Sequence, residues 1–466
     1  MASANGREMD SPTGVQTVWL GQLASLELLP PEILLPIVTN LPGLDMLWNL
    51  MRASPQVWRV FDSHALAIVE GILSGPNSIL APSIRQLVRG VILARSGALP
   101  FRNLEEYHLR FMRGQAPWTR RDQVFISLGP ETLSNPNVSV TALRSTVATA
   151  YQLSALSQAC LASALARLRD PSFKPMHALD PMPHYTWVEE MRALRAMWFI
   201  QLAGEVKHLV TDNTGTTGWL KQDAESLSKM GPLNLIENQN EEWIISRGEE
   251  VKSAMQYLKT LRDATKDMYY RLPRPPPASP SVRWETALPK LNERTTVIRG
   301  FRRDGRVHWI WERPYVLTKD EKPVYLPTDN DACRWGQTEC SLKREAPGLE
   351  RFRSVTAWNH ASPIPGVKFD SLRPFGFAFW DKLRVHQLGL TDGLDWPYFE
   401  PEFYFFAWES IIPVEEVASL KAALREERRI RNAAAMKHCR KPWEAQRRVL
   451  NDCFDDTASQ NTAGKI

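Results

Sequence analysis

Three short helical patterns, separated by helix-breaking residues, lie between Leu28 and Phe61 and constrain the fold of this chain most strongly. The first opens at Pro31, where a first-turn proline costs no hydrogen bond, and Glu32 complements the positive end of the helix dipole. Its apolar residues recur at i, i+4 spacing, which predicts a one-sided helix. They are Leu29, Ile33, Ile37 and Leu41.

Two further helices are predicted directly after this one. Pro42 and Gly43 end the first helix, and Asp45 helps to start a second with an apolar side made of Leu44, Leu47, Trp48 and Met51. Ser54 and Pro55 form an N-cap and first-turn pair that opens a third, in which one face is shared by Val57, Phe61, Ala65, Ile68 and Ile72. Helices this short cannot bury their apolar faces unaided, so the pattern indicates a binding module that packs on the rest of the chain, a partner or both.

The order and spacing of these residues resemble the F-box family, in particular the F-box-like proteins common in filamentous fungi. The similar positions are Leu29, Pro30, Glu32 and Ile33 at the opening, Leu41 and Pro42 at the first turn, Leu44, Asp45 and Leu47 in the second helix, and Ser54 and Trp58 in the third. The resemblance covers residues 28–61, under a tenth of the chain. It implies docking on the Skp adaptor of a cullin-RING ubiquitin ligase, while the rest of the chain holds an unknown protein substrate.

Eight residues are the candidates for adaptor binding: Leu29, Pro30, Ile33, Ile37, Leu41, Leu47, Leu50 and Trp58. Pro36 departs from the family pattern because, inside a helix, it removes a backbone donor at a cost of about 3 kcal/mol. The first helix is therefore expected to be kinked or irregular. The alternative is that the three helices are simply the amino-terminal cap of a larger helical domain.

Composition and cysteine usage place the chain among ordinary globular proteins. Of its 466 residues, 43% are apolar and 23% are charged, which is enough for two or three cores. Its five cysteines are widely spaced, without the paired spacing that zinc or redox sites need, so free thiols are expected.

Met1 to Asp10 lacks a secretory signal, which favours the cytoplasm or the nucleus. The longest weakly charged stretch, 138–166, contains Arg144 and many polar residues, so a buried helix is predicted and no membrane partner.

Helical periodicity continues as far as residue 270. Trp187 to Val210 repeats the pattern with Met191, Leu194, Trp198 and Leu202 on one side, and Glu249 to Tyr270 is predicted as the last long helix. Arg271 to Pro280 then contains five prolines, which favours an extended spacer between domains. A polyproline ligand for an SH3-like partner is the alternative interpretation.

Beyond the prolines the chain becomes aromatic and irregular. A turn at Asp304 and Gly305, followed by alternation through Val307 and Trp309, predicts a short hairpin. Nine of the 17 tryptophans lie from Trp284 onward, and aromatic residues crowd together in several places. Such side chains fill an irregular core or form a groove that holds a substrate.

The net charge of +5 is local in origin. Ten Lys or Arg and three Glu between Lys421 and Arg448 give +7, so the remainder of the chain carries −2. This predicts a basic helix that contacts nucleic acid, an acidic protein or an import receptor, or is simply a solvated face. Nucleic-acid binding ranks low because no aromatic platform or recognised motif accompanies the charge.

The sequence offers little support for catalysis. It contains no phosphate-binding loop, no nucleophile elbow and no pair of histidines at metalloprotease spacing. His177, Asp180 and His184 could be combined into a metal site only weakly, because no helix or hairpin frames them. We therefore predict a non-catalytic adaptor that needs no metal and no cofactor.

The predicted fold is mainly α: a three-helix F-box-like module on a helical domain, followed by an irregular aromatic-rich C-terminal region with a few short strands. The predicted segments are a tail over 1–23, the F-box-like module over 24–72, the helical domain over 73–270, a Pro-rich linker over 271–290, the aromatic-rich partner region over 291–412, the basic helix over 413–450 and a tail over 451–466. The predicted function is substrate recruitment to a Skp-cullin-RING ligase. The alternatives are an interaction protein outside any ligase and a nuclear nucleic-acid-associated factor.

Overall fold

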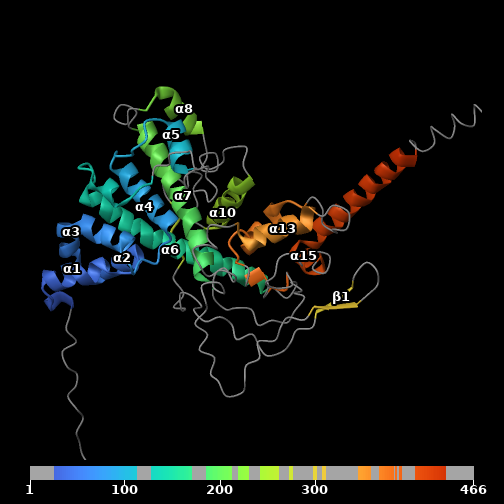
Figure 1. The fold of residues 1–466 in the computed structure, drawn as a ribbon, viewed down its shortest axis with the longest axis horizontal. Coiled ribbons are helices and arrows are strands. Elements are labelled where there is room, and N and C mark those ends of the chain that lie inside the picture. Colours follow the sequence, from blue (N-terminus) through green and yellow to red (C-terminus); the bar gives the residue numbers. More distant parts are fainter. Residues whose placement is uncertain are drawn as a thin grey trace, which may run out of the picture. The chain divides into compact units, whose positions relative to one another are not determined.

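The computed structural model is mainly helical, as predicted (Figure 1). It describes residues 26–112, 127–169, 185–212, 219–229, 242–261, 272–276, 298–301, 307–310, 345–357, 367–381, 384–385, 388–390 and 405–436. The chain divides into two compact units: a first unit of Met1–Leu80 with Leu128–Gln152, and a second unit of Ala81–Ser127 with Leu153–Ile466. The domain limits expected from the sequence stay predictions, although residues 128–152 belong with the amino-terminal helices in this division.

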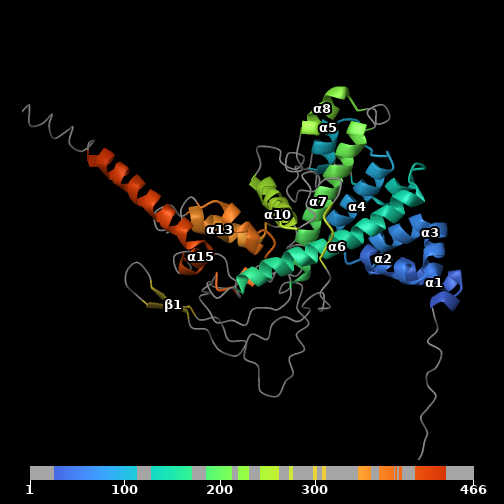
Figure 2. The same ribbon diagram turned by 180° about the vertical axis from the view of Figure 1, so that it is seen from behind.

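The first unit is built around one long helix, α3 (Pro55–Ser74), on which two shorter helices pack. These are α1 (Pro31–Thr39), which follows the short turn η1 (Leu26–Leu28), and α2 (Leu44–Ala53). The 3-10 turn η4 (Pro130–Ser134) also contacts α3, and the first half of α6 (Val140–Leu168) belongs to this unit. Figure 2 labels α1, α2, α3 and α6.

The signals that start α3 act as predicted. The Oγ atom of Ser54 accepts a hydrogen bond from the backbone N–H of Val57 at 3.2 Å, and Pro55 occupies the first turn. All five residues predicted to share the apolar face are buried: Val57, Phe61, Ala65, Ile68 and Ile72. The apolar periodicity of α3 therefore identified its core-facing side correctly.

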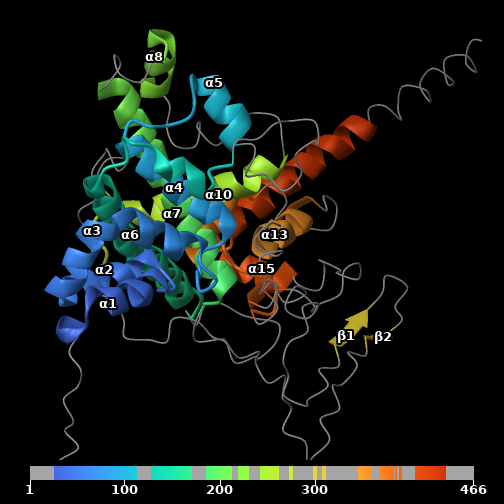
Figure 3. The same ribbon diagram turned by 60° about the vertical axis from the view of Figure 1, so that its left-hand side comes forward.

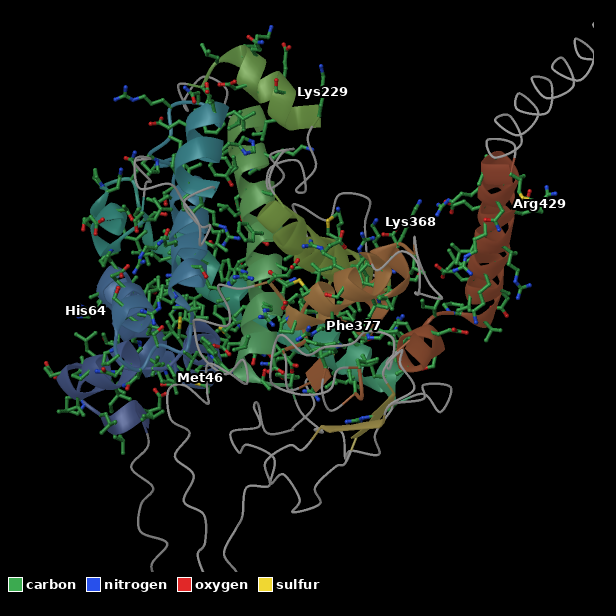
Figure 4. The ribbon with its side chains drawn as sticks, turned by 45° about the vertical axis from the view of Figure 1, so that its right-hand side comes forward. Met46, His64, Lys229, Lys368, Phe377 and Arg429 are labelled. Carbon is green, nitrogen blue, oxygen red and sulfur yellow. The ribbon has the colours of Figure 1, made fainter. Side chains whose placement is uncertain are left out.

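Backbone irregularity lies in α3 and not where Pro36 suggested. Helix α1 continues through Pro36 to Thr39, and the Pro36 carbonyl accepts from the backbone and side-chain nitrogens of Asn40 at 3.2 and 2.9 Å. Pro36 has no N–H to donate to the carbonyl of Glu32, one turn earlier in the helix. Glu32 is exposed, so water can donate to that carbonyl instead. The kink is instead at His64 in α3, where φ is −133° and ψ is 26°; Figure 4 labels this residue.

The second unit is organised around α7 (Trp187–Asp212), which packs against α4 (Pro82–Arg95), α8 (Lys221–Lys229) and α10 (Glu242–Lys259) (Figure 3). Its described residues also include α5 (Leu104–Glu106), the π-helical turn η2 (Tyr107–Met112) and the second half of α6.

Two predicted helices of this unit differ from the structure. Helix α7 was expected to be one-sided, but residues 188–204 are buried all round, including charged side chains. Helix α10 begins at Glu242 and ends at Lys259, before a turn at Thr260. The prediction of a helix from Glu249 to Tyr270 was therefore wrong about the start, and it was wrong at residues 260 and 261, which are not helical. Residues 262–270 lie outside the described part.

The remaining elements belong to the C-terminal half. Strands β1 (Ile298–Phe301) and β2 (Val307–Ile310) pair antiparallel, with Ile298 opposite Ile310. The turn that was expected to join them lies outside the described residues, and the other short strands of this region stay a prediction. Helices α13 (Pro347–Ala357) and α15 (Phe405–Ile411), the turns η5 (Phe369–Ser371) and η6 (Arg373–Phe375), and an exposed helix over 414–436 complete the fold.

Most aromatic side chains that the structure describes in this half form core, although Phe375 is half-buried. Phe377, Phe379, Trp380 and Trp408 are each at most 1% exposed. The Nε1 atom of Trp380 donates to the carbonyl of Phe375 at 2.6 Å, and that of Trp408 to the carbonyl of Leu390 at 3.1 Å. These four rings therefore do not form an open groove for a substrate.

Candidate functional site

The clearest exposed apolar surface of the first unit lies on α1 and the turn before it. Leu28 is 79% exposed, Ile33 52% and Ile37 43%, while Leu34 and Val38, on the other side of α1, are fully buried. Because Leu34 and Val38 already anchor α1 to the unit, the exposed residues are not needed for that purpose. We call Leu28, Pro30, Ile33 and Ile37 the α1 surface.

The eight predicted adaptor-binding residues differ in accessibility. Pro30, Ile33 and Ile37 are exposed, whereas Leu29, Leu41, Leu50 and Trp58 are half-buried. Leu47 is fully buried in the unit's own core and cannot contact a partner without rearrangement. The structure thus brings three of the eight to one open face.

Trp58 is engaged by its own chain. Its ring centroid lies 6.1 Å from that of Trp48, and the guanidinium of Arg144 lies 5.2 Å from the Trp58 centroid. Arg144 is also ion-paired with Asp62. A guanidinium stacked on an aromatic face and held by a carboxylate covers that face. Trp58 is thus covered from α6, which the local sequence pattern of the module could not reveal.

A buried cluster of charges in the second unit joins the start of α7 to residues 379–381 and to Arg384. Arg384 donates from Nε and Nη2 to the two carboxylate oxygens of Glu189 at 3.2 and 3.0 Å. Thr186 donates from its hydroxyl to Asp381 at 2.7 Å, and Arg192 donates to the carbonyls of Phe379 and Trp380 at 3.0 and 3.3 Å. Burial and the charge of Glu189 raise the pKa of Asp381 to about 7. This segment is therefore bound to α7 by polar contacts as well as by its aromatic core.

Helix α10 contributes two more ion pairs. Arg195 of α7 contacts Glu250 at 2.6 Å with both side chains buried, and Arg373 of η6 contacts Glu249 at 2.6 Å. Sequence reasoning missed all of these residues. The one signal available was the presence of Glu189, Glu190, Arg192 and Arg195 in an otherwise apolar helix, which indicates buried pairs.

A small cavity of about 40 Å³ lies between α6, α10 and η6, lined in part by Cys160, Ser253, Tyr257 and Arg373. It has room for about one or two waters and not for a metabolite. Burial raises the pKa of the Cys160 thiol to about 12 and that of the Tyr257 phenol to about 12, so both stay protonated at neutral pH. A thiol in this state is a poor nucleophile, and the cavity offers no catalytic constellation.

The exposed helix over 414–436 neutralises much of its own charge. Arg429 pairs with Glu426 at 2.8 Å, Arg431 with Glu427 at 2.6 Å, and Lys421 with Glu409. The part of the predicted basic segment that the structure describes is therefore an Arg/Glu helix with paired charges. Pairing of this kind weakens the attraction to a nucleic-acid backbone.

Within the described ranges, no group of three His, Cys, Asp or Glu side chains is placed to hold a metal ion. His177, Asp180 and His184 lie outside those ranges. Among the helices that the structure describes, none is long and apolar enough to cross a bilayer.

Comparison of the chain with protein-family models, with curated proteins and with solved structures gave no match. The function is therefore inferred from this chain's own residues.

Proposed function

We propose that this protein is an F-box-like adaptor whose α1 surface docks on a Skp adaptor of a cullin-RING ligase, while its second unit holds a protein substrate. The observation that carries the proposal is the exposure of Ile33 and Ile37 on a helix whose opposite side, Leu34 and Val38, is already buried. Both isoleucines are among the predicted adaptor-binding residues. The protein would act in the cytoplasm or the nucleus by proximity, leaving bond chemistry to other subunits.

Exposed apolar side chains on neighbouring turns of a helix are the anchors of a helix-in-groove interface. Ile33 and Ile37 are four residues apart and so lie one turn apart on the same side of α1. Leu28 and Pro30 extend the apolar area beyond the first turn of the helix. Exposed apolar residues gathered on one helix and the turn before it are typical of a protein-binding surface.

One observation favours the second candidate, an interaction protein that never joins a ligase. Leu47 is buried and Trp58 is covered by Arg144, so two of the predicted docking residues serve the unit's own packing. In that case the α1 surface would bind a partner other than a Skp adaptor. No comparable observation in the described part of the chain favours the nucleic-acid factor.

The test is a binding titration of the full chain with a purified Skp adaptor. The parent is compared with the double variant Ile33→Ala and Ile37→Ala, and with the control Leu66→Ala, because Leu66 is 38% exposed on α3. Truncating two anchors worth about 2 kcal/mol each should weaken the Kd roughly 1,000-fold, whereas the control should stay within about threefold. Circular dichroism checks that all three proteins are folded.

Each outcome separates the candidates. Tight binding that the double variant loses supports the ligase adaptor and its α1 surface. Binding that survives in the double variant means that the adaptor docks elsewhere on the protein. Failure of a folded parent to bind any Skp adaptor rejects the ligase proposal and favours the interaction protein.

A further inference from the structure

Lysine is absent from the first 173 residues of the chain. All 17 lysines lie from Lys174 to Lys465, although an even spread would place about six of them before residue 174. The same 173 residues contain 14 arginines, so positive charge itself is not avoided there. The stretch includes the whole first unit and continues into the second.

The structure does not account for arginine at two of these positions. Arg52 and Arg59 are exposed, on α2 and α3. Within the described part of the chain, Arg59 makes one side-chain contact, a hydrogen bond of 3.4 Å to Gln56, and Arg52 makes none. Arginine is required where it binds a carboxylate with two nitrogens or stacks on a ring. Neither position has such a partner among the described residues, so lysine would serve equally well as a solvated cation.

Arg144 shows what a structural requirement for arginine looks like. It stacks over Trp58 and pairs with Asp62, which a lysine ammonium could not reproduce in the same geometry. The contacts of Arg52 and Arg59 with the described residues therefore give no packing reason for arginine in place of lysine. What distinguishes the two side chains chemically is that lysine can be acylated at its amine, whereas the guanidinium stays protonated and does not act as an acyl acceptor.

Exposed lysines do occur in the second unit. Lys221, Lys229, Lys259 and Lys368 are exposed, and Figure 4 labels Lys229 and Lys368. The chain thus tolerates solvent-exposed amines in general, and the restriction applies to one continuous part of the sequence.

We propose that residues 1–173 are kept free of lysine so that this part of the protein cannot be ubiquitinated by the ligase on which it docks, and that self-modification is confined to Lys174 and beyond. The inference rests on the proposed function, because the ligase brings the conjugating enzyme whose cysteine carries ubiquitin as a thioester. In the excluded reaction a lysine ε-amine attacks the thioester carbonyl of ubiquitin. An amide bond forms, the carbon–sulfur bond breaks, and the amine proton passes to the departing thiolate.

The test restores amines without changing charge. The variant Arg52→Lys and Arg59→Lys is compared with the parent and with a control, Arg274→Lys and Arg425→Lys, made at exposed arginines in the lysine-containing part of the chain. Each full chain is incubated with the Skp-cullin-RING ligase, the activating and conjugating enzymes, ubiquitin and ATP, and the modified residues are located by mass spectrometry. The half-life of each protein in cells is measured in parallel.

We expect ubiquitin on the parent only at Lys174 or later. The variant should carry ubiquitin at positions 52 and 59, with a half-life at least twofold shorter than that of the parent, while the control should differ by less than this. Binding of the Skp adaptor without modification at positions 52 and 59 overturns the inference and leaves the proposed function standing. If the parent does not bind the adaptor, the proposed function fails and the inference fails with it. Equal half-lives for variant and control, in a protein that does bind the adaptor, overturn the inference alone.

Discussion

Arg384 and Glu189 form a two-pronged ion pair between residues 195 positions apart in the sequence, with side chains 1% and 0% exposed. The same Arg384 lies over the ring of Trp380, with its guanidinium carbon 5.4 Å from the ring centroid. Glu189 also accepts from the backbone N–H groups of Thr186 and Asp381. The pair therefore ties the C-terminal aromatic segment to the first turn of α7 in the buried interior of the second unit.

Removing one member of this pair should be costly. Arg384→Met leaves Glu189 buried without its main counter-charge, and we expect a loss of about 3–5 kcal/mol in the free energy of unfolding. Urea unfolding followed by tryptophan fluorescence measures it. The matched control is Arg429→Met, since Arg429 and Glu426 form an exposed pair, and this variant should leave the midpoint unchanged. Equal effects in the two variants would show that the Arg384 pair is not desolvated.

Asp381 should make stability depend on pH in the direction opposite to most carboxylates. Burial and the neighbouring Glu189 charge raise the pKa of Asp381 from 3.8 to about 7, against the hydrogen bonds from Thr186 and Arg384. Between these two pKa values the folded state holds a proton that the unfolded state has lost. The contribution of Asp381 to the free energy of unfolding is therefore fully present below about pH 4 and is lost as the pH rises to about 7.

The variant Asp381→Asn isolates this contribution because its side chain does not titrate. We expect the difference in unfolding free energy between this variant and the parent to grow in favour of the variant between about pH 4 and pH 7, and then to level off. Parallel curves for the two proteins over this range would mean that Asp381 titrates at an ordinary pKa.

The two sides of α1 should respond differently to truncation. Leu34→Ala removes a fully buried side chain and should destabilise the protein by about 2–5 kcal/mol. Ile33→Ala removes a side chain that is half in solvent and should cost well under half as much. Thermal unfolding of the full chain compares them directly. A larger loss for Ile33→Ala would show that the α1 surface is part of the core and not a docking face.

Gly376 should resist substitution for two separable reasons. Its φ of +79° is unfavourable for other residues, and an added Cβ would lie 2.5 Å from Cζ2 of Trp380. Gly97 has a similar φ of +63° with open space around it, so Gly97→Ala is the control for the backbone contribution alone. We expect about 1 kcal/mol for Gly97→Ala and about 2–3 kcal/mol for Gly376→Ala, measured by urea unfolding. Equal losses would mean that Trp380 moves aside at no cost.

Local sequence patterns predicted the helices of the first unit well. Ser54 and Pro55 start α3, and its buried face is the one that periodicity indicated. The pattern was ambiguous in α1 because this helix is apolar on most sides. Ile33 and Ile37 fit an i, i+4 stripe as well as Leu34 and Val38 do, and only packing on α3 decided which pair is buried.

Sequence alone thus determined the mainly helical class, the helix start signals of the first unit and the absence of lysine before Lys174, because each depends on residues that are neighbours in the chain or on composition. The tertiary structure decided which side of α1 stays open, that Arg144 covers Trp58, and that Glu189 pairs with Arg384. These depend on residues far apart in the sequence, and a buried ion pair becomes favourable only when folding brings both partners out of water together.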